Sequence, residues 1–148
     1  MNFLECPKDI DTEEKRILNS VEIAQMINSS FKNRDQMLLK AMYFIGLTSG
    51  DIQKITVEDI DFHNKTARIS NEYKHEYKTI PEGFIEELKE WVSNRTGPLF
   101  PGRNQKGFIS DRHVRRIVKK CAQLSGIEDW SEIKAHSLKH AHRKHISK

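Results

Sequence analysis

Cysteine is scarce in this sequence, and long apolar runs are absent. The two cysteines, Cys6 and Cys121, lie 115 positions apart, which is neither a disulfide framework nor the spacing of a zinc site. No apolar run approaches the roughly 20 residues of a membrane span, and residues 1–16 lack the apolar core of a signal peptide. These absences argue against a secreted mini-protein, a metal-nucleated fold and a membrane protein, and they predict a reducing, cytoplasmic setting.

Several familiar signatures of enzymatic sites are also missing. The sequence has no glycine-rich phosphate loop, no Ser-His-Asp order and no paired-carboxylate site. It shows no internal repeat and no low-complexity segment. With 148 residues, of which 36% are hydrophobic, the chain is long enough to bury a core. We expect a tail or short turn over residues 1–17, a single domain over residues 18–148, and no cofactor.

Positive charge is concentrated near the C-terminus. Residues 103–148 contain twelve Lys and Arg against four Asp and Glu, a net charge of +8, whereas the whole chain has a net charge of +4. Five of the seven histidines also lie there. Such asymmetry is typical of a protein that binds a phosphate-bearing partner.

Apolar periodicity predicts a mostly helical chain. A short helix is expected over 21–28, capped by Asn19 or Ser20. The segment 33–46 leaves almost no polar face, which indicates a central, buried helix that Gly46 can end. Further helices are expected over 49–54, 82–95 and 111–124 and from about residue 136.

Two short strands are expected among these helices, over 66–69 and 77–80, with the charged hairpin NEYKHEYK between them. Glycines and prolines mark the segment 96–106 as a loop. The predicted fold class is therefore α+β, mostly α with a small antiparallel hairpin or three-stranded sheet.

The last two predicted helices are amphipathic, and their polar faces are basic. On the helix over 111–124, Ser110 is the expected N-cap, and Val114, Ile117, Val118 and Cys121 form the apolar stripe. At 100° per residue, the basic residues of each helix share about 140° of arc. These residues are Arg112, Arg115, Arg116, Lys119 and Lys120 on the first helix, and His136, Lys139, His140, Arg143 and Lys144 on the second.

Three segments, read together, resemble a known family. The first is GLTSGDI at 46–52; the second is the hairpin with Lys74 and Lys78; the third is HSLKH at 136–140, followed by His145. In this order and spacing the chain resembles the catalytic domain of the tyrosine recombinase (phage integrase) family, from about Val21 to its last residue. The resemblance implies the integrase catalytic-domain architecture.

That family cleaves DNA with a tyrosine that attacks a phosphodiester and forms a 3′-phosphotyrosine. Two arginines, a lysine and two further histidine-type residues surround the phosphate and meet the charge that builds on its oxygens. By the resemblance, the first arginine position is Thr48 here, and the second is Lys139 in a His-x-x-Arg-His motif that begins at His136. Lys74 matches the hairpin lysine, with Lys78 as the alternative register.

The family's nucleophilic tyrosine would lie beyond Lys148, so we expect a shortened domain that lacks the tyrosine-bearing segment. The candidate substitutes within the sequence are Tyr43, Tyr73 and Tyr77. Tyr43 falls in the most apolar helix and should pack in the core, while a tyrosine of the hairpin is better explained as a groove contact or a cross-strand partner.

A metal site is a weaker interpretation of the histidines. His136 and His140 are four residues apart on one helix, but zinc needs three or four converging ligands. By helical pitch, His142 and His145 should point to the other side. We expect no metal, a packed His145, and Cys121 as an ordinary core residue.

The sequence therefore predicts a DNA-binding protein related to tyrosine recombinases, nucleoid-associated if the source is prokaryotic and without strand cleavage of its own. Its expected partner is double-stranded DNA, and the further candidate partners are a second copy of the chain and a full-length recombinase. The alternative is one part of a split recombinase acting in DNA integration, with the tyrosine supplied in trans. The expected DNA contacts are Lys74, Lys78, Arg112, Arg115, Arg116, Lys119, Lys120, His136, Lys139, His140, Arg143 and Lys144.

Overall fold

A computed structural model of the chain describes residues 16–70, 75–103 and 107–146. Its helices are α2 (Ser20–Asn28), α3 (Asn33–Phe44), α4 (Ser49–Ile52), α5 (Glu82–Val92), α6 (Asp111–Leu124) and α7 (Ala135–His145). Its strands are β2 (Ile60–Asp61), β3 (Thr66–Ser70) and β4 (His75–Thr79), and two 3-10 turns are η1 (Val57–Asp59) and η3 (Trp130–Glu132). The predicted mostly helical fold with a small antiparallel sheet is confirmed.

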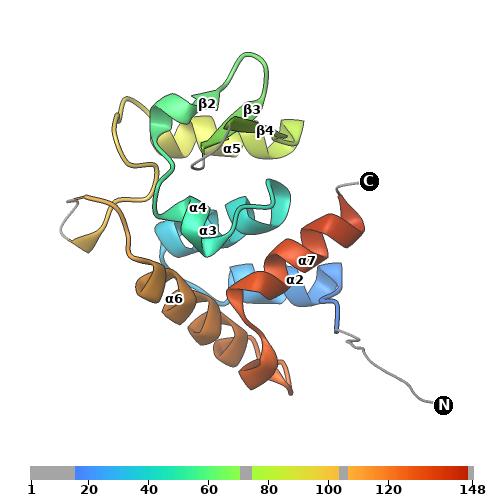
Figure 1. The fold of residues 1–148 in the computed structure, drawn as a ribbon. Coiled ribbons are helices and arrows are strands. Elements are labelled where there is room, and N and C mark those ends of the chain that lie inside the picture. The colour runs from blue at the N-terminus through green and yellow to red at the C-terminus, as the bar shows by residue number, and fades with distance from the viewer. Residues whose placement is uncertain (1–15, 71–74, 104–106, 147–148) are drawn as a thin grey trace.

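Helix α3 lies at the centre of the helical part of the molecule (Figure 1). It packs against α2, α4, α5 and α7, which is why its sequence has almost no polar face. Its fully buried side chains are Leu38, Leu39, Ala41 and Met42. Burying a side chain of the size of Leu contributes roughly 1.5–3 kcal/mol. Gly46, at φ +85, follows the helix as predicted.

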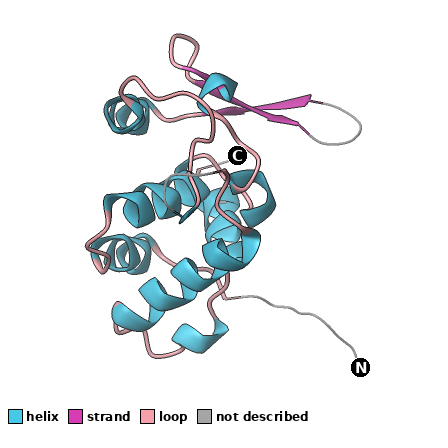
Figure 2. Ribbon diagram, turned by 90° about the vertical axis from the view of Figure 1, so that its left-hand side faces the viewer, coloured by secondary structure: helices cyan, strands magenta, loops and turns pink. Residues whose placement is uncertain are grey.

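The three strands form one antiparallel sheet in the order β2-β3-β4. The sheet lies at one end of the molecule, at the top of the view in Figure 2. Along β3, Ala67 and Ile69 are buried while Arg68 and Ser70 are exposed, as the two-residue period of a strand requires. No described helix is long and apolar enough to cross a membrane.

Some predicted boundaries were wrong by a few residues. Strand β4 begins at His75 instead of residue 77, because His75 pairs with Ser70 across the sheet. Helix α5 ends at Val92 instead of residue 95, since Ser93 adopts φ +54. Beyond it, the guanidinium of Arg95 stacks 4.4 Å from the centre of the Trp91 ring. Helices α3 and α4 likewise end two residues earlier than predicted.

The predicted loop after α5 is held by isolated β-bridges that the sequence did not indicate. Thr56 pairs with Pro98, and Pro101 pairs with Phe108. These bridges lead the chain to Ser110, whose Oγ accepts a hydrogen bond from the backbone N–H of His113 at 3.1 Å. The predicted N-cap and bounds of α6 are thus confirmed, and its apolar stripe is buried, Cys121 included.

Candidate functional site

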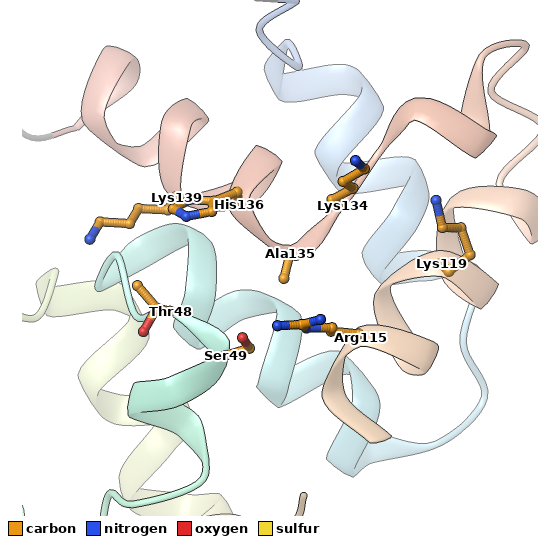
Figure 3. A pocket seen from close by; sticks show the side chains of 8 residues that line it. All are labelled: Thr48, Ser49, Arg115, Lys119, Lys134, Ala135, His136 and Lys139. Carbon is orange, nitrogen blue, oxygen red and sulfur yellow. The ribbon is translucent and has the colours of Figure 1, made fainter. Parts of the chain in front are cut away.

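A pocket of about 380 Å³ lies where α4, α6 and α7 meet. Most of its lining side chains are basic or carry a hydroxyl (Figure 3). The lining residues are Thr48, Ser49, Arg115, Lys119, Lys134, Ala135, His136 and Lys139. The pocket thus joins residues that lie far apart in the sequence, and none of its described lining residues is acidic.

Helix α7 supplies one wall of the pocket. Leu138 and Ala141 are buried on its inner side, so its polar side turns His136 and Lys139 toward the pocket. The ring of His136 lies 5.3 Å from that of His140, one turn further along. Two predicted site residues on α7 therefore belong to this pocket, and Lys134 joins them from the residue before the helix.

Helix α6 supplies the opposite wall through Arg115 and Lys119. Arg115 forms an ion pair with Asp111 one turn earlier, with 3.0 Å between Nε and Oδ2. Lys119 donates a hydrogen bond from Nζ to the carbonyl oxygen of Ser131 at 2.7 Å. This bond ties α6 to the turn η3, which leads into α7.

Thr48 lines the pocket and is the N-cap residue of α4. Its Oγ1 accepts a hydrogen bond from the backbone N–H of Asp51, and the Asp51 carboxylate accepts one from the backbone N–H of Thr48, both at 3.0 Å. This reciprocal capping box satisfies two backbone donors at the start of the helix. The position where the family resemblance puts an arginine is thus used to begin a helix.

The other predicted DNA contacts are spread over different surfaces. His140, Arg143 and Lys144 line a separate shallow pocket with Ile17. Lys120 lines another beside Lys32 and Leu124. The basic arc predicted for each helix is therefore wide enough to face more than one surface.

Four predicted contacts remain. Lys78 donates a hydrogen bond to the carbonyl oxygen of Gly46 at 3.4 Å. Arg112 and Arg116 are exposed on α6 outside the pocket lining. Lys74 lies outside the described residues, as does Tyr73.

The remaining histidines of α7 lie on the other side of the helix, as predicted, and there they contact α3. His142 donates a hydrogen bond from Nδ1 to the carbonyl oxygen of Tyr43 at 2.7 Å. The Tyr43 hydroxyl lies 2.8 Å from Nδ1 of His145, within hydrogen-bond distance. Tyr43 is buried, and burial raises the pKa of its hydroxyl. These contacts confirm the packing predicted for Tyr43 and anchor α7 on the core.

Sequence reasoning missed Lys134 and Ser49 in the pocket. Lys134 precedes α7 in an extended conformation, so no helical periodicity indicates it. Its position two residues before His136 was the available signal. Among the described residues, no group of three or more His, Cys, Asp or Glu side chains could hold a metal ion.

Comparison with known proteins identifies the family. The sequence profile of the phage integrase family matches residues 11–148. This chain belongs to the phage integrase family. One curated relative is the tyrosine recombinase XerC of Corynebacterium glutamicum, which is 30% identical over 142 residues; these cover 90% of this chain and 44% of the relative. Another is XerC of Syntrophus aciditrophicus, which is 28% identical over 150 residues; these cover 88% of this chain and 47% of the relative. The chain thus spans less than half the length of these relatives.

Solved structures of integrases share the fold. The integrase from mycobacterium phage Brujita superposes with a TM-score of 0.74 at 18% identity, over 95% of this chain and 47% of that protein. The catalytic core of lambda integrase gives a TM-score of 0.67 at 13% identity, over 90% of this chain and 86% of that core. The predicted integrase catalytic-domain architecture is therefore confirmed.

Proposed function

We propose that this chain binds double-stranded DNA through its backbone phosphates, with the pocket between α4, α6 and α7 as the central contact. The observation that supports this most is the composition of the pocket lining, in which Arg115, Lys119, Lys134, His136 and Lys139 converge without a carboxylate among the described lining residues. Side chains that neutralise phosphates release condensed counterions from DNA, which provides most of a sequence-independent affinity.

The relatives support a DNA partner. The curated relatives are named tyrosine recombinases. Structures of the same fold include the XerH recombinase bound to its difH substrate and a lambda integrase dimer bound to a core site. We extend DNA binding from these proteins to this chain because five basic residues, Arg115, Lys119, Lys134, His136 and Lys139, line one pocket of the shared fold.

We also propose that this chain does not cleave DNA with its own residues. Thr48 is uncharged, and Lys139 offers a point charge where a guanidinium would offer a planar fork. Tyr43 is buried, and its hydroxyl lies within hydrogen-bond distance of His145. Tyr77 lines a different cavity. No described tyrosine therefore lies at the pocket to attack a phosphate held there.

The proposal is tested by charge removal at the pocket. The triple variant Lys119→Gln, Lys134→Gln, Lys139→Gln should bind a 30-base-pair duplex at least about tenfold more weakly in a mobility-shift titration. The matched control Lys32→Gln, Lys54→Gln, Lys89→Gln removes the same charge from exposed positions elsewhere and should lose much less. Equal losses would refute the pocket as the DNA contact.

Cleavage is tested with a nicked suicide duplex. We expect no protein–DNA adduct that survives denaturation. An adduct on this chain, abolished by Tyr77→Phe or Tyr73→Phe, would contradict the proposal. An adduct on a second, tyrosine-bearing recombinase that forms only when this chain is present would instead support the alternative of a split recombinase.

A further inference from the structure

Among the basic side chains that line the pocket, Arg115 is distinguished by its ion pair with a carboxylate on the same helix. Its side chain is 69% exposed, yet its Nε lies 3.0 Å from Oδ2 of Asp111. Figure 3 shows the guanidinium reaching across the pocket toward Ser49. An exposed arginine normally samples many rotamers, and an ion pair at Nε restricts that freedom.

The backbone of Asp111 is hydrogen-bonded to the end of α4. Its backbone N–H donates a hydrogen bond to Oε1 of Gln53 at 3.0 Å. Gln53 is the C-cap residue of α4, the helix that Thr48 begins. Contacts from α4 through Gln53 to the backbone of Asp111, and from the Asp111 carboxylate to Arg115, therefore link the side chain of Arg115 to the helix that Thr48 begins.

The ion pair is made by Nε, which leaves the two terminal nitrogens of the guanidinium available to bind a ligand. Arginine has five N–H donors, and the four on its terminal nitrogens form a fork that matches two oxygens of a phosphate. The structure gives these nitrogens no partner among the described residues. By contrast, Lys119 already donates to Ser131.

Arg115 is also the only arginine among the described residues that line the pocket. Thr48 and Lys139, at the positions where the resemblance places the family's arginines, offer no fork. Arg116 is the neighbouring residue on α6, exposed and outside the lining. The sequence alone treats Arg115 and Arg116 as equivalent members of one basic face, and the structure separates them.

We infer that Arg115 is the residue that grips and orients a phosphate group in this pocket, and that Asp111 is its positioning residue. The inference rests on the proposed function and specifies it further. The terminal nitrogens of Arg115 take two non-bridging oxygens of one phosphate, and Lys134 and Lys139 add charge around it. The guanidinium shape, in addition to its charge, then determines affinity.

The first test compares charge-conserving substitutions at neighbouring positions. Arg115→Lys should weaken binding of a 30-base-pair duplex about tenfold, because an ammonium cannot form the two parallel contacts. The matched control Arg116→Lys should change affinity less than about twofold. If both variants bind as the unmodified chain does, or weaken equally, Arg115 has no special role.

A second test observes the guanidinium directly. Inorganic phosphate titrated into the isotope-labelled chain should shift the Nε–H resonance of Arg115, assigned by its loss in Arg115→Lys. The Nε–H resonance of Arg116 should move much less. An unmoved Arg115 resonance in the presence of saturating phosphate would overturn the inference.

The role of Asp111 is tested by a double-mutant cycle. Asp111→Asn removes a negative charge, which by itself should tighten DNA binding. In the Arg115→Ala background we expect Asp111→Asn to raise DNA affinity for this reason. With Arg115 present, we expect Asp111→Asn to leave DNA affinity unchanged or to lower it, because the guanidinium is no longer held by the Asp111 carboxylate. Equal tightening in both backgrounds would refute the positioning role.

These results distinguish the inference from the function on which it rests. Duplex binding that depends on the pocket lysines but is indifferent to Arg115→Lys would overturn the inference and leave DNA binding intact. If no duplex binds at all, the proposed function fails, and the phosphate titration still decides whether Arg115 is an anion-binding group.

Discussion

At the scale of single residues, the pocket combines side chains that support the fold with side chains that face solvent. Thr48 accepts and donates the hydrogen bonds of a helix cap, and Asp111 pairs with Arg115. Outside the pocket lining, His142 packs so tightly that a Cβ added to Gly46 would lie 2.5 Å from its ring. Substitutions here therefore change stability and binding by different amounts, which makes the two separable.

Thr48→Arg should tighten duplex binding while it destabilises the protein. The new guanidinium would add a fork to the pocket, but loss of the Thr48 cap should reduce the free energy of unfolding by about 1 kcal/mol. Thr48→Val is the control, since it removes the cap hydroxyl without adding charge. Urea unfolding and duplex titration of both variants check this, and an affinity of Thr48→Arg no higher than that of Thr48→Val would contradict it.

Gly46→Ala should be more destabilising than Gly126→Ala. Both glycines have φ above +80, a conformation that costs an alanine roughly 1–2 kcal/mol. Only Gly46 faces a close neighbour, the His142 ring, whereas nothing lies within 4 Å of a Cβ at Gly126. We expect an additional loss of about 1–3 kcal/mol at Gly46, measured by urea unfolding. Equal losses would show that α7 does not pack on Gly46.

Stability should fall as the pH drops below about 6.5, partly through His142. Burial lowers the pKa of His142 from its ordinary value of 6.5; the neighbouring charges of Lys78, Lys139 and Arg143 lower it too, against the opposing effect of its bond to Tyr43. In the unfolded chain His142 binds its proton at a higher pH than it does in the folded chain. The contribution of neutral His142 to stability is therefore fully present above pH 6.5, and it is lost as the pH falls toward the pKa of His142 in the folded chain.

This pH dependence is measured by urea unfolding between pH 7.5 and 5. His142→Gln should reduce the slope of stability against pH. His113→Gln should reduce it as well, because burial also lowers the pKa of His113. If the His142→Gln variant keeps the full slope of the unmodified chain, His142 does not titrate as its environment requires.

At the scale of elements, α7 is one helix that presents three surfaces. Its inner side packs on α3 through Leu138 and Ala141, His136 and Lys139 face the pocket, and Arg143 and Lys144 face a separate hollow beside Ile17. The double variant Arg143→Ala, Lys144→Ala should therefore weaken duplex binding through lost charge, yet leave the phosphate-induced shift of the Arg115 resonance unchanged. A diminished shift would show that the two surfaces act together.

The elements that the sequence predicts well are those with strong local signals. The bounds of α6 follow from its cap at Ser110 and its apolar stripe, and the buried α3 follows from its lack of a polar face. The composition of the pocket could be predicted only in part. Periodicity places Arg115 and Arg116 on the same face of α6, and only the packing of α4 and α7 against this helix decides which of them enters the pocket.

Contacts between distant segments are what sequence reasoning could not supply. Lys134 has no periodic signal, and the hydrogen bond from Asp111 to Gln53 spans 58 positions. The family resemblance correctly indicated that Thr48, His136 and Lys139 lie together. It did not indicate that Thr48 would be a helix cap.

At the scale of the whole molecule, the segment of the sequence with the most positive charge is also the segment that forms most of the pocket. The sheet lies at one end, while the pocket lies between α4 and the basic helices α6 and α7. Residues 103–148, which hold a net charge of +8, supply all the pocket residues other than Thr48 and Ser49. A positive field centred on this region would attract a polyanion from a distance and orient it over the pocket.

The most direct test of DNA binding at this surface is the salt dependence of duplex affinity. If the chain neutralises about five phosphates, the logarithm of the binding constant should fall linearly with the logarithm of the salt concentration, with a slope of about −4 to −5. The variant Arg115→Ala, Lys139→Ala should reduce that slope by about two. Unmeasurable binding at about 50 mM salt, or an unchanged slope in the variant, would contradict the account.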